Sequence, residues 1–219
     1  MKVFFALDQS TAMRASVGYA LENTQGQIIS AERVIENANP IKPLLEVAKS
    51  LYQELIEAGH TIAMVVATSG PGGFTGLRVC ASVSSAISQV ANCPFVGIGT
   101  LEALAFAHAG GGVIYTCVDA RRSECYCAQF NKQGRTLTQI AETTLISNHE
   151  LEQRLLLHPG VVVGNPVISD TSPVHACRDK SVEYPQAKFI AECALVKFSH
   201  TPREELTPFS IEYVRSAVS

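Results

Sequence analysis

A run rich in glycine, residues 67–79, has the composition of a loop that could hold a phosphate group. It reads Ala-Thr-Ser-Gly-Pro-Gly-Gly-Phe-Thr-Gly-Leu-Arg-Val and separates an apolar run from a helical pattern. A Walker-type loop requires Gly-Lys-Ser/Thr, and Gly76 is followed by Leu77, so that motif is excluded. The amides of a helix N-terminus could still hold an anion, and Thr75 is expected to cap that helix. A strand-to-helix turn without chemical function is the alternative.

Asp8-Gln-Ser-Thr11 follows the first apolar run and is a second candidate for phosphate chemistry. In actin-like phosphotransferases such a position carries an Asp-x-Gly-Thr hairpin, whereas this chain has Ser10 in place of the glycine. A bulkier backbone there would crowd a phosphate. We therefore interpret Asp8, Ser10 and Thr11 as a weak or vestigial nucleotide site.

Metal and nucleophile chemistry have little support. No two of the six histidines are spaced i, i+3 or i, i+4, and no Gly-x-Ser-x-Gly elbow occurs. Asp119 and Glu124 flank a turn that contains Arg121 and Arg122, for which a salt-bridged hairpin is favoured over a functional site. The sequence predicts no catalytic residue and no metal ligand.

Composition narrows the class of protein. The chain has 219 residues, a net charge of −3 and a pI of about 6.1, which argues against a nucleic-acid-binding surface of its own. Seven cysteines without a C-x-x-C pair predict neither a disulfide framework nor a zinc site, and fit a reducing cytosol. No run approaches the length of a membrane span, and the N-terminal apolar run is too short for a signal peptide. We expect a cytoplasmic protein.

Hydrophobic periodicity and turn residues predict the elements that carry these residues. Strands are expected first, in a meander, followed by alternating helices and strands. The expected strands are 3–7, 15–21, 27–34, 62–67 and 94–98, and the expected helices are 39–59, begun by Asn39 and Pro40, 75–90 and 100–108. This order predicts a ribonuclease-H-like mixed sheet with helices on its faces.

Gly110-Gly-Gly112 suggests a break to a second unit. We expect an N-terminal lobe over residues 1–109 and a smaller α/β lobe over 110–219. The second lobe is expected to contain strands 113–119, 124–130, 137–146 and 161–163, and helices 148–156 and 185–199.

The helix behind the glycine-rich loop has an unusual surface. No charged residue occurs between Arg78 and Cys93, and Leu77, Val79, Val83, Ile87 and Val90 are expected to serve the core. Small side chains on its other faces would let another helix approach closely, which predicts a subunit interface. Burial under the second lobe is the alternative.

The run Ser69–Arg78, the charge-free helix, and Pro94-Phe-Val-Gly-Ile-Gly-Thr-Leu101 resemble the TsaB (YeaZ) family of the bacterial tRNA threonylcarbamoyladenosine machinery. Val118-Asp-Ala-Arg121 and Tyr213-Val-Arg215 fit the same pattern. The resemblance implies a two-lobed actin-like fold of the sugar kinase–Hsp70–actin superfamily. The catalytic paralogue in this machinery, TsaD, binds a metal through H-x-x-x-H. The corresponding positions here are Gly99 and Ala103, which fits the non-catalytic type.

The resemblance also implies a role and partners. The chain would be a non-catalytic subunit pairing with a TsaD-type transferase for N6-threonylcarbamoyladenosine formation at position 37 of tRNAs. A TsaE-type ATPase would be the third component, tRNA would bind only to the complex, and the same surface would support a homodimer. No cofactor is expected, and a nucleotide at the boundary with the partner is left open. The implied partner interface comprises Leu44, Ala48, Leu51, Phe74, Thr75, Leu77, Arg78, Ala81, Ser82, Ser85 and Ser88.

Two other function classes remain as alternatives. An actin-like ATPase or small-molecule kinase acting alone would use Asp8, Thr11 and Asp119 around a phosphate. A metallopeptidase would need the histidine pair that the sequence lacks.

Overall fold

A computed structural model of the chain describes residues 1–12, 14–36, 41–167, 172 and 174–214. The chain divides into two compact units. Unit 1 contains Met1–Gly99 and Gln186–Ile211, and unit 2 contains Thr100–Pro185 and the residues from Glu212 onward. The predicted division after residue 109 differs from this one, because the helix after residue 100 belongs to unit 2 and the helix after residue 186 to unit 1.

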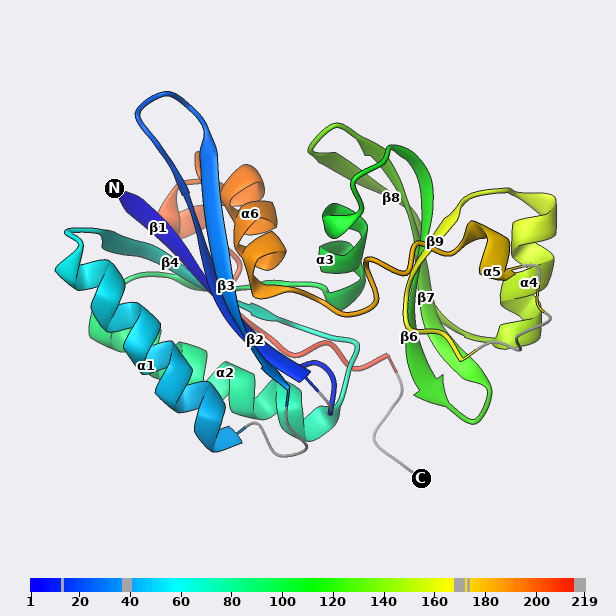
Figure 1. Cartoon of the computed structure of the whole chain (residues 1–219), viewed down its shortest axis with the longest axis horizontal. Coiled ribbons are helices and arrows are strands. Elements are labelled where there is room, and N and C mark those ends of the chain that lie inside the picture. Colours follow the sequence, from blue (N-terminus) through cyan, green and yellow to red (C-terminus); the bar gives the residue numbers. More distant parts are fainter. Residues whose placement is uncertain (13, 37–40, 168–171, 173, 215–219) are drawn as a thin grey trace. The chain divides into compact units, whose positions relative to one another are not determined.

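Unit 1 is built on a mixed sheet of five strands in the order β3-β2-β1-β4-β5 (Figure 1). The first three strands are antiparallel, and β4 and β5 continue the sheet in parallel. This arrangement confirms the predicted meander followed by parallel β-α units. The strands are β1 (Lys2–Asp8), β2 (Arg14–Glu22), β3 (Ile28–Glu36), β4 (Thr61–Thr68) and β5 (Phe95–Ile98).

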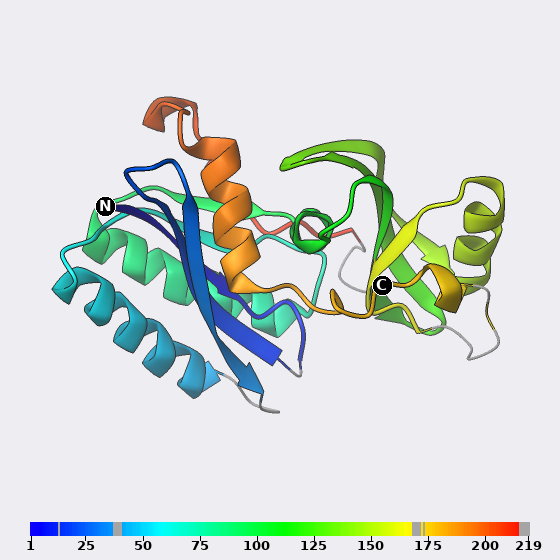
Figure 2. The same ribbon diagram turned by 45° about the horizontal axis from the view of Figure 1, so that its top comes forward.

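Helices cover both faces of this sheet. Helices α1 (Ile41–Glu57) and α2 (Phe74–Ala91) run along one face, and α6 (Ala187–Phe198) crosses the other (Figure 2). Every residue of β1 except Lys2 is therefore buried, as expected for a central strand covered on both sides. The predicted helix start at Asn39 and Pro40 lies outside the described residues, as does Arg215 of the Tyr213-Val-Arg215 segment.

Helix α6 is joined to the sheet of unit 1 by a hydrogen bond at its first residue. The Ser16 side chain of β2 accepts a hydrogen bond from the Ala187 backbone amide at 3.0 Å, which satisfies an amide at the start of α6. Farther along, past the 3-10 turn η1 (Arg203–Glu205), Phe209 stacks on Phe95 with ring centroids 4.4 Å apart. The Phe209 backbone amide also donates to the Phe95 carbonyl, so this segment follows the outer strand of the sheet.

Unit 2 has its own mixed sheet, in the order β8-β7-β6-β9. Helix α3 lies on one side of it, and α4 and α5 lie on the other (Figure 1). The elements are α3 (Thr100–Ala107), β6 (Gly112–Arg121), β7 (Glu124–Gln133), β8 (Thr136–Ser147), α4 (Asn148–Leu157), β9 (Val161–Gly164) and the short α5 (Val174–Cys177). The predicted strands of this region and its helix 148–156 are confirmed. The predicted helix 185–199 corresponds to α6 of unit 1, and α5 was not predicted.

Candidate functional site

The glycine-rich loop lies against the turn that follows β1. The Gly73 backbone amide donates a hydrogen bond of 2.7 Å to the Ser10 carbonyl. A Cβ atom at Gly72 would lie 2.6 Å from that same carbonyl oxygen, and a Cβ atom at Gly76 would overlap the carbonyl of Gln9. Only glycine allows so close an approach of two backbones. The glycines thus allow close packing between the two loops that were the candidates for phosphate binding.

Helix α2 starts one residue before the position predicted from Thr75. Its N-cap is Gly73, whose extended backbone carries no side-chain cap and whose carbonyl accepts the Leu77 amide at 3.0 Å. The prediction that Thr75 caps the helix is therefore wrong. Thr75 lies in the first helical turn, because the hydrogen bond from Gly73 to Ser10 fixes where the chain enters the helix.

Asp8, at the end of β1, is buried and hydrogen-bonded within the chain. Its Oδ1 atom accepts the Thr68 hydroxyl at 2.7 Å and the Ser10 backbone amide at 3.1 Å. Burial raises the pKa of Asp8 from 3.8 to about 6, against the opposing effects of the Thr68 and Ser10 hydrogen bonds and of the Arg14 charge. A carboxyl group enclosed in this way is not presented to a ligand in solution.

The other predicted nucleotide residues, Ser10 and Thr11, lie in the turn between β1 and β2. Ser10 is buried, and its hydroxyl has no hydrogen-bond partner among the described residues. The Thr11 hydroxyl donates to the Arg14 carbonyl at 3.1 Å, which closes the turn into β2. The structure brings Asp8 and Ser10 together, as predicted, but in a closed turn beneath the glycine-rich loop.

Asp119, which the ATPase alternative requires, belongs to unit 2. Its Oδ1 atom accepts the Arg121 backbone amide at 2.8 Å, and its own amide donates to the Asn165 side chain at 3.1 Å. These bonds hold the turn between β6 and β7. Across the described ranges, no group of three or more His, Cys, Asp or Glu side chains could hold a metal ion.

The predicted partner interface is wrong in part, because several of its residues lie in the core of unit 1. Leu44, Ala48 and Leu51 form the ridge of α1 that packs on the sheet, and Leu77 is buried at the start of α2. Ser88 is also buried, and its hydroxyl donates to the Ser85 carbonyl at 2.9 Å. The exposed predicted residues are Phe74, Thr75, Arg78 and Ser82, and the half-buried ones are Ala81 and Ser85.

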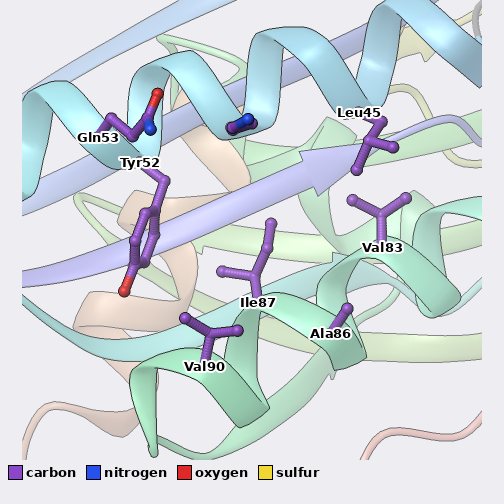
Figure 3. A pocket seen from close by; sticks show the side chains of 8 residues that line it. Leu45, Tyr52, Gln53, Val83, Ala86, Ile87 and Val90 are labelled. Carbon is purple, nitrogen blue, oxygen red and sulfur yellow. The ribbon is translucent and has the colours of Figure 1, made fainter.

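A different set of side chains lines an open groove between α1 and α2 (Figure 3). We call it the α1–α2 groove; its volume is about 320 Å³. Leu45 and Val90 at its margins are 55% and 75% exposed, and apolar side chains from both helices point toward one another across it. The groove is lined by Leu45, Lys49, Tyr52, Gln53, Val83, Ala86, Ile87 and Val90.

Sequence reasoning missed this groove by assigning its α2 residues to the core. Val83 and Ile87 are only partly buried, and Val90 is largely exposed. One available signal was the width of the apolar stripe on α1. Leu45 and Tyr52 are seven residues apart and make a second ridge beside the one that faces the sheet. An exposed apolar groove of this kind is typical of a surface that another molecule covers.

The first turns of α2 carry an exposed pair of side chains that does not line the α1–α2 groove. The Arg78 guanidinium lies 3.7 Å from the centroid of the Phe74 ring, and both side chains are exposed. Stacking of this kind holds a flexible arginine in place while leaving its charge accessible. Arg78 and Phe74 are members of the predicted interface that remain on the surface.

No helix that the structure describes is long and apolar enough to cross a membrane.

Comparisons with solved structures identify the fold. The chain superimposes on a Pseudomonas aeruginosa protein described as similar to peptidase YEAZ, with a TM-score of 0.74, 21% identity, and coverage of 98% of this chain and 100% of that one. YeaZ from Pseudomonas aeruginosa gives a TM-score of 0.68 at 21% identity, over 95% of this chain and 99% of that one. With the two helix-flanked mixed sheets, this likeness confirms the predicted actin-like, ribonuclease-H-like fold class.

Comparisons of sequence identify the family. The tRNA threonylcarbamoyladenosine biosynthesis protein TsaB of Escherichia coli is 27% identical over 85 residues, which is 37% of this chain and 37% of that protein. The TsaB protein of Bacillus subtilis is 27% identical over 95 residues, 42% of this chain and 40% of that protein. The matches thus span well under half of these relatives. Residues 38–186, more than half of the chain, match the family described as "TsaD: tRNA N6-adenosine threonylcarbamoyltransferase", and the chain therefore belongs to that family.

Proposed function

We propose that the chain is a non-catalytic subunit that pairs with a TsaD-type threonylcarbamoyl transferase and supports N6-threonylcarbamoyladenosine formation in tRNA. The α1–α2 groove is the observation that carries this proposal. It is open, apolar and lined by two helices, and α2 has no charged residue after Arg78. A helix of a partner could bury its apolar side against Leu45, Ile87 and Val90.

The geometry of the glycine-rich loop supports a role without catalysis. In a working phosphate site the loop amides must face a ligand. Here Gly72 and Gly76 lie against the backbone of Ser10 and Gln9, and Asp8 is hydrogen-bonded to Thr68. Gly99 and Ala103, at the positions of the paralogue's histidine pair, have no side chains that can ligate a metal.

The names of the relatives support the choice of pathway. The Escherichia coli and Bacillus subtilis relatives are named as tRNA threonylcarbamoyladenosine biosynthesis proteins, and the matching family is a threonylcarbamoyltransferase family. On this proposal the TsaE-type ATPase joins the pair, and tRNA binds to the assembly. With a net charge of −3, the chain has little electrostatic attraction of its own for tRNA.

Reconstitution tests this function. The full chain, a TsaD-type subunit, a TsaE-type ATPase, threonylcarbamoyl-adenylate and substrate tRNA are combined, and each protein is omitted in turn. We expect the chain alone to give no modified tRNA, and its omission to abolish turnover by the others. The proposal fails if the chain modifies tRNA without a TsaD-type subunit, or if the other components work equally well in its absence.

Two variants, Val90→Lys in the groove and Ile140→Glu outside it, test whether the reconstituted activity depends on the α1–α2 groove. Ile140 lies on β8 in unit 2 and is 50% exposed, so it is a matched site for placing a charge on an exposed apolar residue. Turnover is expected to fall with Val90→Lys and to persist with Ile140→Glu. Equal turnover by both variants would show that the groove is not the functional surface.

A further inference from the structure

Three thiols lie together in the core of unit 2. Cys117 on β6 and Cys125 and Cys127 on β7 are all buried, on the face of the sheet that α4 covers with Leu151 and Leu155. Cys117 and Cys127 are directly opposite each other in the antiparallel β6–β7 pair, and their Sγ atoms are 3.7 Å apart. We call Cys117, Cys125 and Cys127 the thiol cluster.

The strand register suits a covalent bond between the two opposed thiols. Directly paired residues of antiparallel strands have Cα atoms about 4.5–5.5 Å apart, within the range of about 4.4–6.8 Å that disulfides span. Closing the Sγ–Sγ distance from 3.7 Å to the bonded length of about 2.05 Å requires side-chain rotation and no change of register. Cys125 is two residues from Cys127 and pairs with Asp119, so it lies diagonally from Cys117.

Hydrogen bonding within the thiol cluster distinguishes the two sulfur atoms. The Cys117 thiol donates to the Cys127 sulfur. That hydrogen bond lowers the pKa of Cys127, with help from the Arg154 charge and against the effect of burial. Hydrogen bonds with Cys125 and Cys127, together with burial, raise the pKa of Cys117. Cys127 is thus the better nucleophile of the pair, because the thiolate is the reactive form of cysteine.

We propose that Cys117 and Cys127 form a reversible intramolecular disulfide when the chain meets a small two-electron oxidant such as hydrogen peroxide. The Cys127 thiolate attacks one peroxide oxygen, the O–O bond breaks, and the departing hydroxide takes a proton to become water. Cys127 is then a sulfenic acid. The Cys117 sulfur attacks the Cys127 sulfur, the S–O bond breaks, and a second water leaves with the Cys117 proton. Two thiols and one peroxide give one disulfide and two waters.

Helix α4 packs over the thiol cluster. Its buried residues are Leu151 and Leu155, while Leu156 and Leu157 are exposed. The Tyr115 hydroxyl fastens its C-terminal end by donating to the His158 carbonyl at 2.8 Å. A ten-residue helix on the surface opens locally more readily than the paired strands beneath it. Oxidation of the cluster is therefore expected to follow the opening rate of α4 and to be slower than that of an exposed thiol.

Peptide mass spectrometry of the native full chain tests the disulfide. The folded chain is treated with hydrogen peroxide, remaining thiols are alkylated, and the chain is digested with trypsin without reductant. Cleavage after Arg121 and Arg122 separates Cys117 from Cys125 and Cys127. We expect peptides 79–121 and 123–132 to be linked, and fragmentation to assign the link to Cys117 and Cys127. Reduction with dithiothreitol should separate the two peptides.

Cysteine-to-alanine variants test which residues form the disulfide. Cys117→Ala and Cys127→Ala are expected to abolish the linked peptides, whereas Cys125→Ala and Cys193→Ala, a buried thiol of unit 1, are expected to retain them. The wild-type fragmentation pattern alone decides the assignment if a variant does not fold. The proposal is overturned if the peroxide-treated wild type yields no linked peptides, or if the link joins Cys117 to Cys125. Neither result depends on the proposed tRNA-modification role.

Discussion

Gly76 lies against the carbonyl group of Gln9 so closely that a Cβ atom at position 76 would overlap the carbonyl oxygen. This contact ties the start of α2 to the turn after β1 and gives the glycine-rich loop a structural purpose. The two sequence features that suggested phosphate chemistry thus pack against each other.

The loop contact predicts a large cost for Gly76→Ala. Because the obstructing atom belongs to the backbone of Gln9, the two loops must separate, and we expect the free energy of unfolding to fall by about 2–3 kcal/mol. Gly73→Ala is the matched control, since its Cβ atom would meet the Ser10 carbonyl at an ordinary 3.5 Å and should cost about 1 kcal/mol or less. Urea unfolding measures both; equal losses would contradict the close-approach explanation.

The raised pKa of Asp8 predicts that the stability of the folded chain depends on pH. Its pKa is raised from 3.8 to about 6, so the folded chain binds this proton more tightly than the unfolded chain does. Its contribution to the free energy of unfolding is therefore greatest below about pH 4, falls as the pH rises to about 6, and is constant above that. In Asp8→Asn the amide oxygen can still accept from Thr68 and Ser10.

We expect Asp8→Asn to be more stable than the wild type by up to about 3 kcal/mol at pH 8, and the difference to vanish near pH 4. Thr68→Val is the opposing control, because it removes a hydrogen bond that favours the charged carboxylate and should destabilise the chain at pH 8. Denaturant unfolding across this pH range provides the measurement. A stability difference that does not change with pH would rule out titration of Asp8 as the cause.

Tyr115 is expected to control local opening of α4. Tyr115→Phe removes the hydroxyl that donates to the His158 carbonyl at 2.8 Å, with an expected cost of about 1 kcal/mol. Amide hydrogen exchange in α4 should accelerate roughly fivefold, since 1.4 kcal/mol corresponds to about tenfold. Tyr126→Phe, at a half-buried site on the neighbouring strand, is the control. Unchanged exchange in Tyr115→Phe would show that this hydrogen bond does not limit the opening of α4.

The α1–α2 groove also predicts self-association when no partner is present. A second copy could cover the exposed Leu45 and Val90 side chains with its own groove in a symmetric dimer. Val90→Lys would place a charge in that contact and shift the equilibrium to monomer. Sedimentation equilibrium of the wild type, Val90→Lys and Ile140→Glu measures the effect. A dimer of unchanged affinity in Val90→Lys would place self-association on another surface.

The order of elements could be predicted because local signals agreed with the fold. The apolar runs of β1 and β4 reflect burial on both faces of the sheet. Gly59, with a φ of 77°, ends α1 through its own backbone conformation. The unit to which α6 belongs could not be predicted, because its attachment depends on the bond from Ala187 to Ser16, 171 residues away in the chain. Periodicity identifies a buried face and does not identify what buries it.

The candidate surface was predicted less well than the fold. The predicted interface and the α1–α2 groove involve the same two helices, but Leu44, Ala48 and Leu51 face the sheet. Leu45 and Tyr52 face the groove. Successive residues on a helix point in directions about 100° apart, so one of two adjacent leucines can face the core while the other faces the surface. Apolar composition alone does not distinguish the two. Likewise, the glycines signalled a close approach, and only the structure identifies Gln9 and Ser10 as the groups approached.

Isothermal titration calorimetry of the full chain with a TsaD-type subunit tests whether the α1–α2 groove is the partner surface. We expect a saturable heterodimer whose affinity falls about 100-fold with Leu45→Glu, because a charge would be buried against apolar side chains. Leu45 is 55% exposed in the free chain, so the variant should fold, and Ile140→Glu should bind like the wild type. No binding by the wild type, or equal affinity of Leu45→Glu and wild type, would contradict the assignment of the α1–α2 groove as the partner surface.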